Sequence, residues 1–564
     1  MASISKSDYD RCMTEQQKKL AGPAGLGRSA WVAYLGIATI TVLLYGKVIP
    51  FGYVEHDDAI LIKQDHQFLK DLSHIPEAFG RDVFHVTGMD SGKIYYRPIL
   101  TISFMIDTQL GGTNLAVFHI TNILIHILAA CLLLHFLMAL QVRKGVALFL
   151  VMAFAVHPLL VQAVAWVPGR NDSMLTVFAL ACLLLLMRFH RTGNWIVCGL
   201  HLLFFALALF TKENAIGLLV VQAYLLVVIL RQNRRWPRVL TVGAGWLVIV
   251  TIWFLLRNAA LNYPPLPPFK RGMATLFENL PMLVQYIGKI LFPFNLSTTP
   301  TIQDTGYLFA ALGVGCTILS LVLSKGISWR KTIFAATWFL VFLLPSFVIP
   351  GLLGFEHRIY LPFVGFLVLL HESAPLRRAD PGSRMFRAIA CGVVAALFAI
   401  SFFRCDVFRD RDSFWASAVK SSPHSRMAHL NYGTALLEAD RWEEAAALYQ
   451  EYLKRDADPT LFHNNLAVIY ATHKMFAEAE QEFKAEMEIN PDYAEAYVNL
   501  GGLYHSTGRK DQAEKLWKKT IEISPRHLKA HSLLLRYYRS QGDSVRYQQI
   551  VKEMERKGIR VRIP

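Results

Sequence analysis

Apolar residues dominate the chain up to Arg404 and come in eleven runs that charged residues, proline or glycine separate. Most of these runs approach the ~20 residues that an α-helix needs to cross the ~30 Å hydrocarbon layer of a membrane. A helix satisfies its own backbone hydrogen bonds, which a lipid environment demands. The pattern predicts eleven membrane spans, at residues 30–50, 115–140, 146–167, 172–188, 194–210, 214–230, 238–256, 305–324, 332–350, 359–371 and 386–403.

Two of the segments between these spans have a structure of their own. Residues 51–114 are too polar to cross a membrane but carry several helical patches, so we expect a folded first outer loop at the membrane surface. Within a second outer loop, 257–304, residues 274–291 place leucine and isoleucine at helical spacing, with polar residues elsewhere. This pattern is typical of an amphipathic helix that lies in the membrane interface.

After Arg404 the chain becomes charged, and its helical pattern repeats. Pro491 and Pro525 are 34 residues apart, and each follows the same array of aromatic and small residues. The arrays are His463, Leu466, Ala467, Tyr470, Ala479 and Phe483, then Tyr497, Leu500, Gly501, Tyr504, Ala513 and Trp517. This is the tetratricopeptide (TPR) spacing. We expect about three repeats and a degenerate cap over residues 412–564, close to the minimum for a stable solenoid.

Composition and charge support a membrane protein and suggest its orientation. Hydrophobic residues make up 54% of the chain and charged residues 18%, against about 25% charged in soluble proteins, with a mean hydropathy of +0.33. The net charge of +16 falls in alternate loops, so we attribute it to cytoplasmic loops and anionic lipid rather than to nucleic acid. This puts a tail at 1–29 inside, and the repeats and the first outer loop outside.

The most suggestive polar residues are Asp57 and Asp58, which directly follow the first span. Two adjacent carboxylates at a membrane surface are unfavourable unless they bind something or share a proton. One interpretation is a solvated loop start or a helix N-cap. The other is that one of them removes a proton from an acceptor hydroxyl, as a general base does.

The other candidate residues come from the remaining outer loops and from the start of the second span. Three loops each place a cation beside a carboxylate, which indicates either local ion pairs or, if the loops converge, a site for a phosphate. Arg97 is either a snorkelling anchor or part of this site, and His119 and Asn122 share a helix face that also suits structural hydrogen bonds. The loop residues are Arg170 with Asp172, Lys212 with Glu213, and His357 and Arg358 with Glu356.

Metal and disulfide chemistry are not indicated. Five of the seven cysteines lie inside apolar runs, and there is no CxxC pair. His119, Asn122 and His126 have no carboxylate in the same motif, which makes a weak metal-ligand set. We therefore expect neither a metal site nor a bound cofactor.

Taken together, these motifs resemble the GT-C membrane glycosyltransferases, and most closely the transmembrane-and-TPR-containing branch related to protein O-mannosyltransferases. The resemblance covers essentially the whole chain, and the order of the motifs makes it specific. The motifs are His56-Asp57-Asp58, Tyr96-Arg97-Pro98, Phe118-His119 to Asn122, His157-Pro158 through Gly169-Arg170, Lys212-Glu213, His357-Arg358 with Tyr360-Leu361-Pro362, and the repeats.

The resemblance implies an all-α fold: a GT-C helix bundle at 30–404 followed by the TPR solenoid. It implies inverting transfer of a sugar, usually mannose, from dolichyl or polyprenyl phosphate to a Ser or Thr hydroxyl of a protein on the outer face, without a metal. Asp57 matches the catalytic base of the family, and Asp58 its neighbour. Arg358 is the best match for the cation on the donor phosphate, with His357, Lys212 and Arg170 as weaker candidates.

Several alternatives stay open at this stage. A lipid-linked glycan ligase that acts on a lipid or polysaccharide acceptor would share the membrane architecture. A non-enzymatic membrane scaffold would explain the repeats, which we otherwise expect to recruit a protein acceptor, but not the polar outer loops. A transporter would carry its polar groups near the midplane of broken spans. Because eukaryotic members of the family carry many more repeats, we expect a bacterial inner membrane with periplasmic repeats; the alternative is an endoplasmic reticulum membrane with lumenal repeats.

Overall fold

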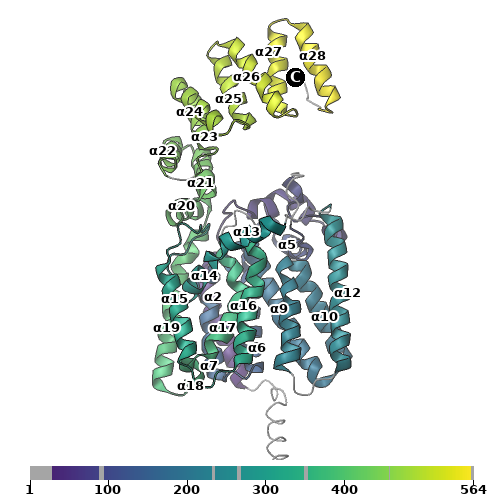
Figure 1. Cartoon of the computed structure of the whole chain (residues 1–564), viewed down its shortest axis with the longest axis vertical. Coiled ribbons are helices and arrows are strands. Elements are labelled where there is room, and N and C mark those ends of the chain that lie inside the picture. The colour runs from purple at the N-terminus through teal and green to yellow at the C-terminus, as the bar shows by residue number, and fades with distance from the viewer. Residues whose placement is uncertain are drawn as a thin grey trace, which may run out of the picture. The chain divides into compact units, whose positions relative to one another are not determined.

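The computed structural model describes residues 28–87, 95–230, 236–262, 269–348, 354–455 and 458–559. Throughout these residues the chain is helical and has no strand, which confirms the predicted all-α fold class. It divides into two compact units, Met1–Phe414 and Trp415–Pro564 (Figure 1). The predicted cytoplasmic tail at 1–29, except its last two residues, and most of the basic loop at 231–238 lie outside the described residues.

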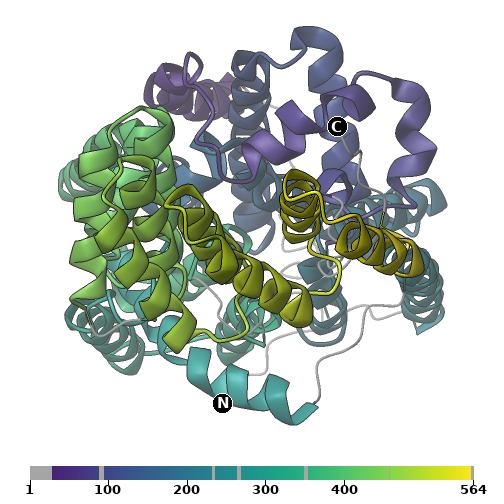
Figure 2. The ribbon, with the colours of Figure 1, turned by 90° about the horizontal axis from the view of Figure 1, so that it is seen from above.

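Within the described residues, each of the eleven predicted spans is mostly helical. Seen from above, the long helices of the membrane unit are nearly end-on, so they run in a common direction (Figure 2). The helices that cover the predicted spans are α2 (Arg28–Tyr45), α6 (Leu115–Ala139), α7 (Lys144–Ala155) with α8 (Val161–Ala165), α9 (Arg170–Thr192), α10 (Trp195–Thr211), α11 (Leu218–Tyr224), α12 (Trp236–Ala260), α15 (Leu308–Val322), α16 (Trp329–Phe347), α17 (Tyr360–Glu372) and α19 (Arg384–Cys405).

Length and composition separate these helices into stronger and weaker spans. Within the described part of the chain, six helices are long and apolar enough to cross a membrane, or seven if the bent pair α7 and α8 is one span. Three further apolar helices are shorter, and α17 has only 13 residues. The chain is therefore a multi-pass membrane protein, and the count of eleven stays a prediction.

The bend between α7 and α8 brings functional motifs to one end of the membrane unit. It measures 49° and occurs at His157-Pro158, where proline has no N–H to donate to a helical hydrogen bond. The His157 side chain accepts from the backbone N–H of Leu159 and so begins the next turn. After the bend, α8 packs against the short helix η9 (Glu356–Ile359), which carries His357 and Arg358.

The segment at 51–114, predicted as the first outer loop, is folded around a small apolar core. It contains the short helices η2 (Ala59–Gln64), α3 (His66–Leu69) and α4 (Ile75–Ala78), followed by α5 (Pro98–Gly111). Buried leucine, isoleucine and phenylalanine side chains from these elements pack together and against Phe118 of α6. This core holds the polar residues of the loop in fixed positions, which a solvated loop without a core would not do.

The amphipathic segment predicted as one helix at 274–291 is two helices, α13 (Phe269–Asn279) and α14 (Pro281–Leu291). They separate at Leu280 because Pro281 cannot donate the backbone hydrogen bond that a continuous helix requires. α14 also packs closely against another helix of the membrane unit. A Cβ on its Gly288 would approach Ala310 of α15 to 2.6 Å, so the two backbones are in close contact and α14 is part of the protein interior.

The second unit begins within α20 (Arg411–Ser421) and continues with four helix pairs that stack on one another. They are α21 (Arg426–Glu438) and α22 (Trp442–Leu453), α23 (Phe462–Thr472) and α24 (Phe476–Ile489), α25 (Ala494–Ser506) and α26 (Lys510–Ile523), and α27 (Leu528–Ser540) and α28 (Ser544–Arg556). The repeating aromatic and small positions of the sequence form one continuous core. This confirms the predicted repeats and shows the expected cap as a fourth helix pair.

The small residues of the repeat are needed where the two helices of a pair cross. A Cβ on Gly501 would lie 2.5 Å from the indole nitrogen of Trp517, whereas one on the adjacent Gly502 would meet nothing within 4 Å. We therefore expect Gly501→Ala to destabilise the pair α25–α26 by about 1–3 kcal/mol, because overpacking forces side chains apart. Gly502→Ala is the matched control and should be neutral or stabilising. Hydrogen exchange of α25 and α26 in the whole chain measures both; equal protection in the two variants would contradict this account.

Candidate active site

The two carboxylates after the first span have different environments. Asp58 is only 2% exposed, and its carboxylate accepts three backbone hydrogen bonds, from Val54 at 2.8 Å and from His56 and Ala59 at 3.0 Å. It thereby closes a tight turn in which Glu55 has a φ of +51°, a left-handed conformation that few side chains adopt. The Asp58 carboxylate therefore holds the shape of this turn.

Asp57 has the more accessible carboxylate of the pair. Its side chain is 32% exposed, and its carboxylate lies beside the His56 ring, with 3.7 Å between His56 Nδ1 and Asp57 Oδ1. Burial raises the pKa of the Asp58 carboxyl from 3.8 to about 6, against the opposing effect of its three N–H donors. A raised pKa suits a general base, but the oxygens of Asp58 are occupied, so the geometry favours Asp57 as the group that meets an acceptor hydroxyl.

Two ion pairs lie on the neighbouring loops. The Lys212 ammonium is 2.7 Å from both carboxylate oxygens of Asp172 and 3.2 Å from the side-chain oxygen of Asn171. The Arg97 Nε is 3.3 Å from the Glu213 carboxylate, which also accepts from a backbone N–H of the first outer loop. Burial lowers the pKa of Lys212 to about 8, although Asp172 favours the charged form.

The short helix η9 brings His357 and Arg358 to the same place. His357 Nε2 is 4.0 Å from a carboxylate oxygen of Asp172, and the Arg358 guanidinium lies 5.3 Å from the centre of the Phe355 ring. Burial, and after it the charges of Lys212 and Arg358, hold the pKa of His357 well below its ordinary value. His357 is therefore neutral at physiological pH and adds no charge to the site.

These loops together form a cluster with three cations and two carboxylates. Arg97, Lys212 and Arg358 lie within electrostatic range of one another and of Asp172. Glu213 is the second carboxylate. The excess of one positive charge in a largely buried setting is an arrangement that favours an anion such as a phosphate. We call these five residues the cation cluster.

The turn that carries Asp57 meets the loop that carries Arg358. The ring of His56, next to Asp57, lies 6.2 Å from the ring of Phe355 between centres, and Phe355 is the ring over which the Arg358 guanidinium lies. The structure therefore brings together the two loops that the sequence singled out for the base and the phosphate contact.

Three of the sequence candidates lie apart, inside the helix bundle. Arg170 is fully buried; its guanidinium is 2.6 Å from the Asp107 carboxylate and 2.6 Å from the side-chain oxygen of Asn122, and it donates to the Phe118 carbonyl at 2.8 Å. Asn122 in turn donates to the backbone carbonyl of Val164 in α8. His119 is also buried on this face of α6. These contacts favour a structural role for Arg170, Asn122 and His119.

Residues that the sequence did not single out support η9 through Glu356, the carboxylate that the sequence placed beside His357 and Arg358. The Glu356 carboxylate is fully buried and pairs with Lys289 of α14 at 3.2 Å and with Arg404 of α19. Gln162 accepts from the backbone N–H groups of Glu356 and His357, at 3.1 and 3.3 Å. In the sequence, Lys289 was visible only as a basic residue in an amphipathic helix, and Arg404 only as the arginine at the end of the last span. Neither position indicated Glu356 as a partner.

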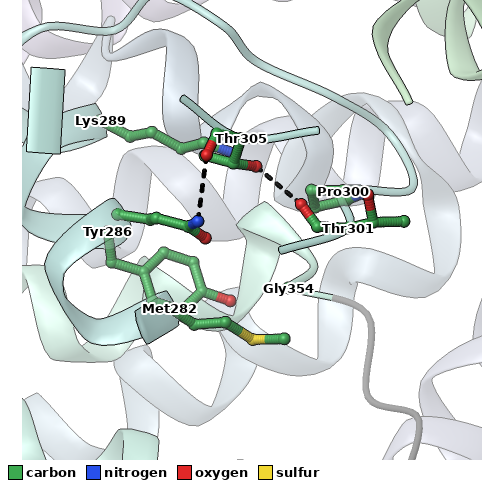
Figure 3. A pocket seen from close by; sticks show the side chains of 8 residues that line it. Met282, Tyr286, Lys289, Pro300, Thr301, Thr305 and Gly354 are labelled. Atoms are coloured by element: carbon green, nitrogen blue, oxygen red, sulfur yellow. Dashed lines mark hydrogen bonds between the residues drawn. The ribbon is translucent and has the colours of Figure 1, made fainter. Parts of the chain in front are cut away.

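A small cavity lies beside Lys289. Met282, Tyr286 and Lys289 of α14 line it opposite Pro300, Thr301 and Thr305 (Figure 3). Tyr286 also donates to the Phe355 carbonyl at 3.0 Å, which ties the cavity wall to the site. The volume open to the centre of a water-sized sphere is only about 10 Å³, which is room for about one water molecule and not for a sugar. The cation cluster is therefore the better candidate for a substrate site. Among the described residues, no group of three His, Cys, Asp or Glu could hold a metal ion.

Comparisons with known proteins agree with both units. Family models described as Tetratricopeptide repeat match residues 412–462, 433–491 and 471–537. A protein O-mannosyl-transferase of Caenorhabditis elegans is 23% identical over 75% of this chain and 63% of its own length. Protein O-mannosyl-transferase TMTC4 of Mus musculus is 24% identical over 74% of this chain and 65% of its own. TMTC1 of Homo sapiens, also named a protein O-mannosyl-transferase, is 30% identical over 31% of this chain and 19% of its own.

These relatives confirm the resemblance that the sequence motifs indicate. The chain spans less than two thirds of the length of the curated relatives it matches. Among solved structures, a crystal structure of MamA is 21% identical over 26% of this chain and 86% of that chain, with a TM-score of 0.23.

Proposed function

We propose that this relative of the protein O-mannosyl-transferases is an inverting membrane glycosyltransferase. Its donor is a polyprenyl- or dolichyl-phosphate sugar of the mannose type, and its acceptor is a Ser or Thr hydroxyl of a protein at the outer membrane face. The repeats recruit that acceptor. One observation carries the proposal: an accessible carboxylate, Asp57, lies on a turn that contacts the loop of a buried cation cluster.

The proposed reaction needs one base and one anion site. The acceptor oxygen forms a bond to the anomeric carbon of the sugar, while the bond from that carbon to the phosphate oxygen breaks. The hydroxyl proton goes to the Asp57 carboxylate, and the bonding electron pair leaves with the lipid phosphate. Arg358 and Lys212 stabilise the charge that develops on the phosphate, and Arg97 adds to the positive field. The phosphate is already a good leaving group, so the second carboxylate that a glycosidase uses as acid is not required.

The donor class is tested by incubating the purified full chain with a panel of polyprenyl-phosphate sugars and following release of the lipid phosphate in the presence of Ser- and Thr-containing peptides. We expect release from at least one lipid-phosphate hexose, mannose foremost, and none from a soluble nucleotide sugar. Release from the nucleotide sugar alone would show that the donor class is wrong.

The role of Arg358 gives a separate prediction. Arg358→Ala removes a charge-assisted contact to the phosphate, which contributes ~1.5–3 kcal/mol, so the KM for the lipid-phosphate donor should rise roughly 10- to 100-fold. Arg409→Ala is the matched control, because that guanidinium is exposed and pairs with Asp406. Steady-state kinetics with varied donor measures both variants, and an unchanged KM in Arg358→Ala would remove this residue from the donor site.

A further inference from the structure

Four aromatic rings form a closed circle beside the cation cluster. Trp166 lies 5.5 Å from His56 and 5.4 Å from His357, measured between ring centres. Phe355 completes the circle, at 5.3 Å from His357 and 6.2 Å from His56. We call these residues the ring quartet. They come from three separate parts of the chain, so the fold has assembled them rather than a local sequence repeat.

Two polar atoms of the ring quartet are buried without a hydrogen-bond partner among the described residues. They are the indole Nε1 of Trp166 and the Nδ1 of His357, whose residues are 4% and 6% exposed. A buried polar group that lacks a partner costs about 1–3 kcal/mol, and such groups are uncommon in native proteins. Since both atoms belong to adjacent rings next to the charged residues, they point to a polar ligand at this place.

The ring quartet lies between the two halves of the proposed reaction. On one side, His56 is next to Asp57, with 3.7 Å between Nδ1 and the carboxylate. On the other side, His357 Nε2 is 4.0 Å from Asp172 in the cation cluster. In a transfer from phosphate to hydroxyl, the sugar must lie between the base that receives the proton and the cations that hold the phosphate. The ring quartet occupies that interval.

The two partnerless atoms are complementary in chemistry. The Trp166 indole can only donate a hydrogen bond. His357 is neutral, and since its Nε2 faces the Asp172 carboxylate, the ring proton belongs on Nε2 and Nδ1 is an acceptor. A sugar hydroxyl both donates and accepts, so one hydroxyl satisfies both atoms. The anionic phosphodiester of the donor would instead meet the lone pair of Nδ1, which is unfavourable.

We propose that Trp166 and His357 recognise one hydroxyl of the transferred sugar and thereby determine which sugar this protein uses. The inference rests on the proposed function and deepens it. It also changes the part of His357, which the sequence motifs assigned to the donor phosphate, to a contact with the sugar. The flat rings of His56 and Phe355 then offer apolar surface to the C–H groups of the same sugar.

The test compares Trp166→Phe with the wild-type chain on a series of donors that each lack one sugar hydroxyl. In the wild type, loss of the recognised hydroxyl should lower kcat/KM by roughly tenfold or more, because it leaves the buried indole N–H unpaired. In Trp166→Phe, transfer from the complete donor should fall by a similar factor, and the discrimination against that one deoxy donor should largely disappear. Trp246→Phe is the matched control, because its indole donates to His201 inside the bundle; it should discriminate as the wild type does.

Two variants at His357 make the test independent of Trp166. Asparagine presents a polar atom close to the position of Nδ1, whereas glutamine presents one close to Nε2. His357→Asn should therefore retain the discrimination, and His357→Gln should lose it. If the wild type transfers no sugar from any lipid phosphate, the proposed function is wrong and this inference falls with it. If the wild type transfers sugar and Trp166→Phe discriminates against the deoxy donor as strongly as the wild type does, this inference alone is overturned.

Discussion

Asp57→Asn is expected to lower the rate of sugar transfer by about 10²–10⁴-fold while donor affinity changes little. The amide keeps the shape of the carboxylate but cannot accept the proton of the acceptor hydroxyl. The Asp57 side chain is partly exposed, and the carboxylate that holds the turn is that of Asp58, so the substitution should leave the turn intact. The measurement is kcat with saturating donor, together with donor binding and hydrogen exchange of residues 54–59.

Asp58→Asn is the variant to compare, because we expect it to lower activity by loosening the turn and not by removing the base. Asn has a single side-chain oxygen for three backbone donors, and its NH₂ group would face an N–H. The turn should therefore loosen, and exchange of the Val54 and His56 amides should quicken together with the loss of activity. If Asp57→Asn kept full transfer, Asp57 would not be the base. If neither variant lost transfer, the base mechanism itself would be wrong.

The second large effect concerns stability. Glu356→Gln removes the carboxylate that pairs with Lys289 and Arg404, and so leaves two buried cations without their common partner. Breaking a buried ion pair in this way costs about 3–5 kcal/mol. We expect the thermal unfolding midpoint of the detergent-solubilised protein to fall by several degrees and the donor KM to rise, because η9 loses its support.

A control for this variant is Glu77→Gln. Glu77 pairs with Arg81 at the surface of the first outer loop, where its side chain is 42% exposed, and such exposed pairs contribute ~0–1 kcal/mol. Its midpoint should stay close to that of the wild type. Equal midpoints for Glu356→Gln and Glu77→Gln would show that the buried pairs do not hold η9 in place.

Much of the fold could be predicted from the sequence, because it depends on local patterns. Runs of apolar residues locate the membrane helices, and the 34-residue repeat locates the helix pairs of the second unit. The amphipathic helix was predicted without its break, since the apolar periodicity continues through Pro281 and conceals the interruption. Gln285 and Lys289, which the pattern placed away from the apolar face, are buried in the structure. How deeply α14 is buried depends on contact with α15, and no local pattern reports that contact.

The candidate site could be predicted only in part, since it depends on which loops meet. Asp57, Lys212 and Arg358 were visible as charged residues in apolar surroundings. Arg170 looked equivalent to them in the sequence, and only the position of Asp107 shows that its charge is matched inside the bundle. Trp166 was not identified, because one tryptophan at the end of an apolar run is ordinary; its importance comes from the rings of His56 and His357, which other loops bring to it.

The central claim is most directly tested by a transfer reaction with the wild-type chain and Asp57→Asn side by side. Each is incubated with polyprenyl-phosphate mannose and a peptide rich in serine and threonine, and the peptide is analysed by mass spectrometry. The predicted result is a hexose on a Ser or Thr hydroxyl after incubation with the wild type, and at most a trace with Asp57→Asn. Equal amounts of hexose with both proteins, or transfer by the wild type only to a lipid or glycan added in place of the peptide, would contradict the account.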